Sequence, residues 1–176
     1  MFDVSLFLRL LHPRISFSVL LTVLAIAIAA TCAVLAFANI RKFRNVILVW
    51  LIACLYLMFH IAIFGRESRE FYSLHLIPFW SIESIQNGFV ETLYEKLNNI
   101  LFFIPFGCLL GIYIKEKVIS RSLIIGTVTS ITIELLQLIT KTGTCETDDV
   151  ICNTVGCAIG SLVVAGMVRI ISRKHT

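Results

Sequence analysis

The chain has 176 residues, of which 58% are hydrophobic, and its formal net charge is +4. Soluble domains contain about 45–50% apolar residues, so the excess indicates helices that face lipid and excludes an ordinary soluble enzyme. The positive charge does not indicate nucleic-acid binding, because the Lys and Arg residues gather between apolar runs, where membrane topology accounts for them.

Apolar runs give the fold class. A membrane-spanning helix needs about 20 mostly apolar residues. We therefore predict an all-α polytopic membrane protein, with about five transmembrane helices in a single membrane domain over residues 1–176. The predicted spans are residues 15–38, 46–64, 99–114, 122–140 and 150–171.

The segment between the second and third spans is too polar for a sixth span. Aromatic residues flank Pro78, as is common at the headgroup level, and Ser81 is a candidate helix N-cap. Apolar residues then recur at helical spacing, at Ile82, Ile85, Phe89, Leu93 and Leu97. We expect an interfacial amphipathic helix, which a break at Asn87-Gly88 would divide in two. A simple amphipathic connector is the alternative.

Charged loops predict the orientation. With the N-terminus outside, nine Lys and Arg residues lie on the inner side and six on the outer side. The inner ones are Arg41, Lys42, Arg44, Lys115, Lys117, Arg121, Arg169, Arg173 and Lys174; the outer ones are Arg9, Arg14, Arg66, Arg69, Lys96 and Lys141. The positive-inside rule then favours an outer N-terminus and a cytoplasmic C-terminus.

Polar residues cluster where the fourth span ends and the fifth begins. Glu134 and Gln137 belong to the fourth span, and Asp148, Asp149 and Asn153 belong to the fifth. A carboxylate at a helix centre costs about 2.5–3.5 kcal/mol on insertion scales. The cost is smaller near a helix end, but convergence from two helices still predicts a functional site, and the predicted orientation places it on the outer side.

Helical spacing sharpens this prediction. Glu134 and Gln137 share one stripe of the fourth span with Gly126 and Ser130, because residues three and four apart lie on one face. On the fifth span, Asp149 and Asn153 share a stripe with two glycines. Small residues let helix backbones approach closely, so we predict helix-packing roles for Gly107, Gly111, Gly156 and Gly160.

Each of these polar residues also has a structural interpretation. Asp148 suits a cap of the fifth span, since carboxylates stabilise helix N-termini, and Asn99 could cap the third. Glu134 and Gln137 could simply hydrogen-bond across helices, and Arg66 and Arg69 could anchor the chain at the interface. Whether Cys145 and Cys152 form a disulfide stays open.

Four segments together resemble the VanZ-like family of bacterial membrane proteins. His75-Leu76-Ile77-Pro78-Phe79 is similar to an N-L-x-P-F element, and residues 98–107, NNILFFIPFG, match its N-[IVL]-[IL]-x-F-[IV]-P-x-G element. Residues 133–137, IELLQ, and 148–156, DDVICNTVG, resemble its E-x-x-Q and D-D-[VIL]-x-x-N-T-x-G elements. The resemblance covers residues 66–160. His75 stands where Asn is usual, and Glu146 stands where Asp is usual.

The resemblance implies a bacterial plasma-membrane protein whose family namesake raises resistance to the lipoglycopeptide teicoplanin. It implies no settled reaction. Membrane lipids or a lipid-linked cell-envelope precursor are the expected partners; we expect no cofactor, metal or nucleic acid, and the sequence does not indicate an oligomeric state.

Two function classes follow from the outer polar cluster. In the first, the protein binds or shields an envelope component, with Asn99, Gln137, Asn153, Arg66 and Arg69 as substrate-binding residues. In the second, it is a membrane-embedded enzyme that modifies a lipid-linked precursor or phospholipid, and Glu134 and Asp149 are the candidate acid–base groups. The absence of an obvious nucleophile in the sequence places the enzyme second.

Overall fold

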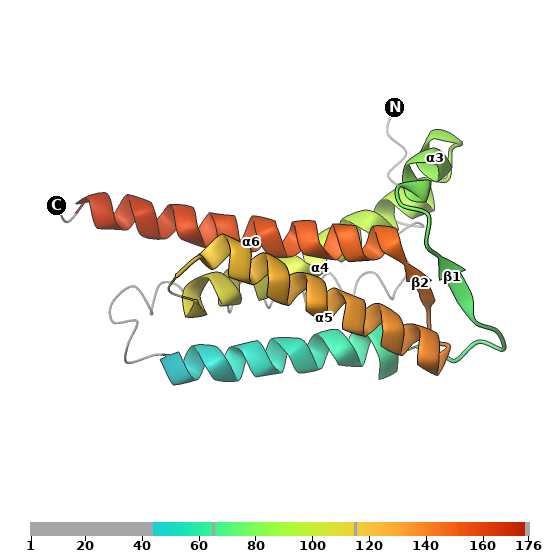
Figure 1. Cartoon of the computed structure of the whole chain (residues 1–176), viewed down its shortest axis with the longest axis horizontal. Coiled ribbons are helices and arrows are strands. Elements are labelled where there is room, and N and C mark those ends of the chain that lie inside the picture. The colour runs from blue at the N-terminus through green and yellow to red at the C-terminus, as the bar shows by residue number, and fades with distance from the viewer. Residues whose placement is uncertain (1–43, 65, 115, 175–176) are drawn as a thin grey trace, which may run out of the picture.

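A bundle of long helices dominates the computed structural model, which describes residues 44–64, 66–114 and 116–174 (Figure 1). Within these residues, four helices are long and apolar enough to cross a membrane: Arg44–Phe64, α4 (Val90–Tyr113), α5 (Val118–Thr140) and α6 (Thr147–Lys174). The last turns of the first form the π-helix η1 (His60–Phe64). The predicted all-α membrane fold is confirmed; the first predicted span, residues 15–38, lies outside the described residues.

The segment before α4 differs in detail from the prediction. A short helix, α3 (Trp80–Gln86), has Phe79 rather than Ser81 at its N-cap, and Ser81 is buried in its first turn. The chain breaks at Gly88, whose φ is +92°, a conformation that glycine adopts without strain. α4 then begins at Val90, well before the predicted residue 99, because the helical pattern of the amphipathic segment runs into the span without interruption.

Glycines set the spacing between α4 and α6, which run in the same direction. A Cβ built on Gly156 would lie 2.1 Å from the carbonyl oxygen of Ile100, and one on Gly160 would lie 2.1 Å from that of Ile104. No side chain could occupy either position without moving a backbone. α4 and α6 therefore touch backbone to backbone over several turns.

α5 returns between the same two ends of the bundle and packs on α6. A Cβ on Gly126 would lie 2.7 Å from the Sγ of Cys157, so this contact is also close. The buried residues of α5 are Ser122, Gly126, Ser130, Ile133, Glu134 and Gln137, which confirms the predicted stripe. Apolar side chains such as Ile124 and Val128 face outwards, as lipid-facing residues do.

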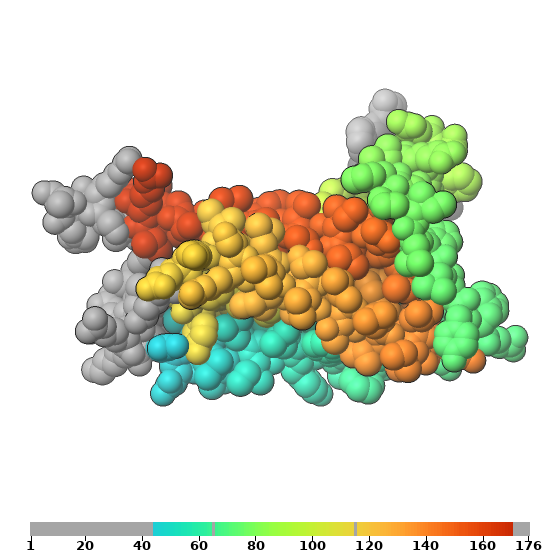
Figure 2. All heavy atoms as spheres, in the orientation of Figure 1, coloured from blue at the N-terminus to red at the C-terminus, as the bar shows by residue number. Residues whose placement is uncertain are grey.

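Two short strands join the loop after η1 to the turn between α5 and α6. β1 (Ser73–His75) pairs in parallel with β2 (Thr144–Glu146), in a register that places Ser73 opposite Thr144 and His75 opposite Glu146. In Figures 1 and 2, this ladder and α3 cover one end of the bundle. Residues that are about 70 positions apart in the chain thus meet at that end.

The glycine contact gives a matched pair of substitutions on one helix. Gly160→Ala should lower the melting temperature in detergent, because overpacking costs about 1–3 kcal/mol. Gly166→Ala should leave it unchanged or raise it slightly, since a Cβ there meets no described atom within 4 Å and alanine favours a helix by about 1 kcal/mol. Equal melting temperatures for the two variants would contradict the close contact of α4 and α6.

Candidate functional site

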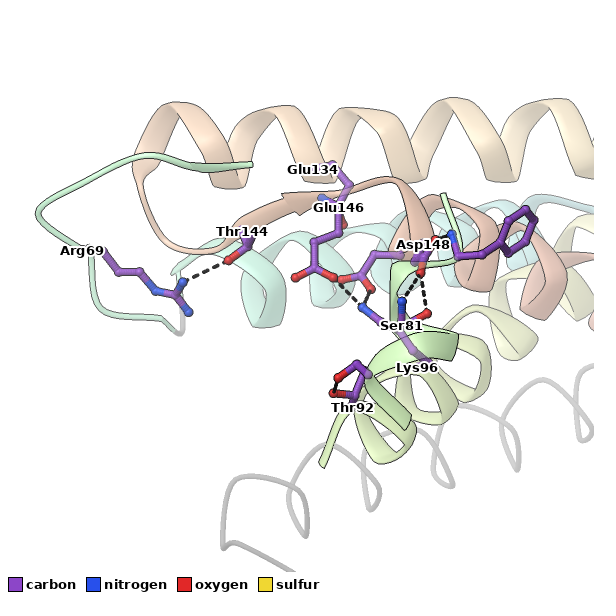
Figure 3. A network of polar contacts seen from close by, with 11 residues as sticks. Arg69, Ser81, Thr92, Lys96, Glu134, Thr144, Glu146 and Asp148 are labelled. Carbon is purple, nitrogen blue, oxygen red and sulfur yellow. Dashed lines mark hydrogen bonds and ion pairs between the residues drawn. The ribbon is translucent and has the colours of Figure 1, made fainter. Parts of the chain in front are cut away.

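A buried lysine stands at the centre of the polar end of the bundle. The Nζ of Lys96, on α4, lies 2.6 Å from Oε2 of Glu146 and 2.5 Å from Oδ1 of Asp149 (Figure 3). The three side chains are 7%, 12% and 20% exposed, respectively. Taking such charges out of water is costly unless they are paired, so Lys96 and its two carboxylates stabilise one another.

Glu134, on α5, is linked to this ion pair through the backbone of Glu146. Its buried carboxyl group accepts a hydrogen bond of 3.0 Å from the backbone N–H of Glu146. One turn deeper, the Nδ2 of Asn153 donates to the Oγ of Ser130 over 2.8 Å, which links α6 to α5. We call Lys96, Glu134, Glu146, Asp149 and Asn153 the polar cluster.

Asp148 does not serve only as a cap of α6. Its Oδ1 accepts a 2.5 Å hydrogen bond from the backbone N–H of Phe79, and its Oδ2 accepts from both the backbone N–H and the Oγ of Ser81. It therefore fastens the start of α3 to the start of α6. Asp148 lies in the first turn of α6, as the sequence suggested, and it also has partners 67 to 69 residues away in sequence, which the sequence did not indicate.

α3 closes over the lysine as a result of this attachment. The ammonium of Lys96 lies 5.3 Å from the centroid of the Trp80 ring, a cation–π contact, and Trp80 packs edge-on against His75 at 4.7 Å. The hydroxyl groups of Ser84 and Thr92 hydrogen-bond at 3.0 Å and hold α3 to α4.

The other predicted site residues are only partly brought together. The Nε2 of Gln137 donates to the carbonyl oxygen of Ala62 over 3.1 Å. This hydrogen bond links α5 to the π-helix, so the amide group of Gln137 has a structural partner. Asn99 is half-buried within α4, so it caps no helix, and among the described residues its side chain forms no hydrogen bond with the polar cluster.

Two exposed arginines border the cluster on the side of the α5–α6 turn. The Nη1 of Arg69 donates to the Oγ1 of Thr144 over 3.1 Å, two residues before Glu146. A Cβ built on Gly143 would lie 3.2 Å from the Nη1 of Arg66, so this guanidinium lies against the same turn. Both arginines thus stand beside the carboxyl groups without forming ion pairs with them among the described residues.

Burial changes the acidity of groups in this turn. It raises the pKa of the Glu146 carboxyl above its usual value, and the hydrogen bond from Lys96 opposes that shift. Burial, with the nearby carboxyl groups of Glu134 and Glu146, also raises the pKa of the Cys145 thiol. The thiols of Cys145 and Cys152 are both free.

Metal binding is not supported by the described part of the chain, which contains no group of three or more His, Cys, Asp or Glu residues with suitable geometry. The ammonium of Lys96 occupies the position between two carboxylates that a cation would otherwise take.

Lys96 is the central residue that the sequence interpretation missed, since it was counted only among the outer Lys and Arg residues. The sequence did contain a pattern that indicates burial of Lys96. It lies seven residues before Phe103 and eleven before Gly107, so it extends the buried face of α4 by two turns towards the N-terminus of the helix. A single cation on the apolar face of a helix, together with several carboxylates near the start of another helix, indicates a buried ion pair.

The ion pair predicts an asymmetry between single and combined substitutions. Lys96→Met should destabilise the folded protein by about 3–5 kcal/mol, because two carboxylates lose their partner. The triple variant Lys96→Met/Glu146→Gln/Asp149→Asn should recover part of the lost melting temperature. Arg121→Met is the control: its ion pair with Glu116, at 3.9 Å, is mostly exposed and should be worth less than about 1 kcal/mol. A triple variant no more stable than Lys96→Met would contradict the pairing.

Sequence comparisons with known proteins show the family. The family model described as VanZ/LLP1 matches residues 43–169, which is well over half of the chain. Protein VanZ from Enterococcus faecium is 32% identical over 115 residues, and the matched segment covers 65% of each chain, slightly less than two thirds of the relative's length. No solved structure matches. The matched family region contains every residue of the polar cluster, and the chain belongs to the VanZ/LLP1 family.

Proposed function

We propose that this protein binds the polar headgroup of an envelope amphiphile at the outer face of the bacterial plasma membrane, and so shields the envelope from teicoplanin-type lipoglycopeptides. The observation that carries the proposal is the gathering of three carboxyl groups at one end of the bundle: Glu146 and Asp149 pair with the ammonium of Lys96, and Glu134 accepts a hydrogen bond from the backbone N–H of Glu146. The bound amphiphile is a membrane lipid or a lipid-linked precursor.

Charge supports a binding role for the cluster beyond packing. Two carboxylates pair with the ammonium of Lys96 and a third carboxyl group, that of Glu134, is hydrogen-bonded to the backbone beside them, whereas a single ion pair would suffice to hold α4 against α6. Glu146 and Asp149 also keep 12% and 20% of their side-chain surface exposed, so a ligand can reach them. An excess of acceptors that stays accessible suits a headgroup rich in hydrogen-bond donors.

The same geometry favours binding over catalysis. Asp149 was a candidate acid–base group, but its carboxylate is held at 2.5 Å by the Lys96 ammonium. A general base must lie within hydrogen-bond reach of the proton it takes, and this oxygen of Asp149 is already occupied by the ammonium. Glu134 carries a backbone hydrogen bond and remains the carboxyl group that a ligand could engage without breaking an ion pair.

The family supports the physiological part of the proposal. The chain is similar to Protein VanZ, and its resemblance to the VanZ-like family, whose namesake raises resistance to teicoplanin, supports a role at the cell envelope. The distribution of Lys and Arg supports the outer location. Arg44, which stacks on Tyr113 at 5.0 Å, and Arg121 lie at the end opposite the polar cluster, where the positive-inside rule expects the cytoplasm.

The orientation can be tested with introduced cysteines. In intact cells, a membrane-impermeant maleimide should label Glu67→Cys, which is exposed at the cluster end, and should leave Glu116→Cys unlabelled until the membrane is opened. The parent protein sets the background, and Cys145 is a poor reporter because the pKa of its thiol is raised. Labelling of Glu116→Cys alone would place the polar cluster in the cytoplasm and overturn the proposed location.

The carboxyl groups can be tested by substitutions that preserve shape. Glu134→Gln keeps an oxygen to accept from Glu146, so it should reach the membrane at normal abundance and melting temperature, yet lose most of the protection against teicoplanin. Asp149→Asn should also lose protection, with a lower melting temperature, because it weakens the ion pair with Lys96.

Two comparisons keep this test specific. Arg121→Gln, at the far end, should retain full protection. Asp148→Asn should loosen α3 and lower stability without removing a cluster carboxylate. The measurements are inhibitory concentration and binding of labelled teicoplanin to cells. Full protection in both Glu134→Gln and Asp149→Asn would defeat the proposal.

A further inference from the structure

Two buried polar atoms beside the Lys96 ion pair have no hydrogen-bond partner among the described residues. One is an acceptor, the Oδ1 of Asn153, and the other is a donor, the Nε1 of Trp80. Asn153 is only 4% exposed, so solvent does not explain its free oxygen. Buried polar groups are satisfied in the great majority of cases, and each exception calls for a physical explanation.

The position of Asn153 relates its free oxygen to the cluster. Asn153 lies one turn below Asp149 on the same face of α6, and helical side chains tilt towards the N-terminus, which here means towards Asp149. Its Nδ2 is fixed on Ser130, one turn below Glu134 on α5. The free oxygen therefore lies beneath the carboxyl groups of Glu134 and Asp149, where a group that donates several hydrogen bonds would satisfy all three.

Positively charged side chains, which would suit an anionic group, lie near the start of β2. The guanidinium of Arg69 is held at Thr144, and that of Arg66 lies against Gly143. Both arginines are exposed, and neither forms an ion pair among the described residues. Guanidinium groups bind phosphate through paired N–H donors.

We propose that the polar cluster recognises a zwitterionic headgroup that carries a primary ammonium and a phosphate, as phosphoethanolamine does. The ammonium binds Glu134, Asp149 and Asn153, and the phosphate binds Arg66 and Arg69. This inference rests on the proposed function and names the chemistry of its ligand. A quaternary amine lacks the N–H donors that the free oxygen of Asn153 requires, and an anionic headgroup lacks the cation.

The test compares lipids that differ only in the headgroup. Purified full-length protein in detergent is titrated with phosphatidylethanolamine, phosphatidylcholine and phosphatidylglycerol that carry the same acyl chains, and binding is followed by native mass spectrometry. Phosphatidylethanolamine should bind about tenfold more tightly than either of the others, which is the effect of one hydrogen bond to a charged group. Equal affinity for phosphatidylethanolamine and phosphatidylcholine would overturn the inference.

Variants locate the preference in the polar cluster. Glu134→Gln and Arg66→Gln should each remove most of the preference for phosphatidylethanolamine, whereas Arg121→Gln, at the far end, should retain it. A preference that survives both cluster substitutions would place the headgroup elsewhere and overturn the inference. Water-soluble glycerophosphoethanolamine carries the same headgroup without the acyl chains. If it competes with phosphatidylethanolamine for the protein, the headgroup alone is recognised. If it does not compete and the preference for phosphatidylethanolamine remains, the protein recognises the whole lipid.

This outcome is separable from that of the proposed function. If Glu134→Gln abolishes protection against teicoplanin while phosphatidylethanolamine and phosphatidylcholine bind equally, the proposed function stands and the headgroup assignment fails. If the preference is found and depends on Glu134, but Glu134→Gln still protects cells, the headgroup assignment stands and the shielding role fails.

Discussion

The close parallel contact of α4 with α6 is the constraint on which the polar end of the bundle depends. Gly156 and Gly160 let the two backbones meet, and the spacing they set carries back one or two turns to Lys96 and Asp149. A wider spacing would leave the ammonium short of its carboxylates. Packing in the apolar part of the bundle thus determines the electrostatics at its end.

The periodic features of this fold were predictable from the sequence. Apolar runs predicted the described spans, because lipid imposes a length and a composition on every helix that crosses it. The stripe of α5 was predictable for the same kind of reason, since Gly126, Ser130 and Glu134 recur at helical spacing. Such features depend on residues that are close in the chain.

The features that escaped prediction depend on residues that are far apart. Asp148 carries a carboxylate at a helix start, which looks like a local cap, but its partners belong to α3. Lys96 was not recognised as part of a buried ion pair because its two carboxylates lie 50 and 53 residues further along the chain. The pairing of β1 with β2 has no signal in three-residue strands. Only the three-dimensional contact of α4, α6 and the α5–α6 turn reveals these roles.

The order of synthesis gives the Lys96 ion pair a further consequence. Lys96 enters the membrane with α4, whereas Asp149 follows 53 residues later with α6. The ammonium meets its first carboxylate partner, Glu146, only 50 residues after Lys96 in the chain. A chain truncated before α6 would lack Asp149 and also the helix on which α4 packs through its glycine contact.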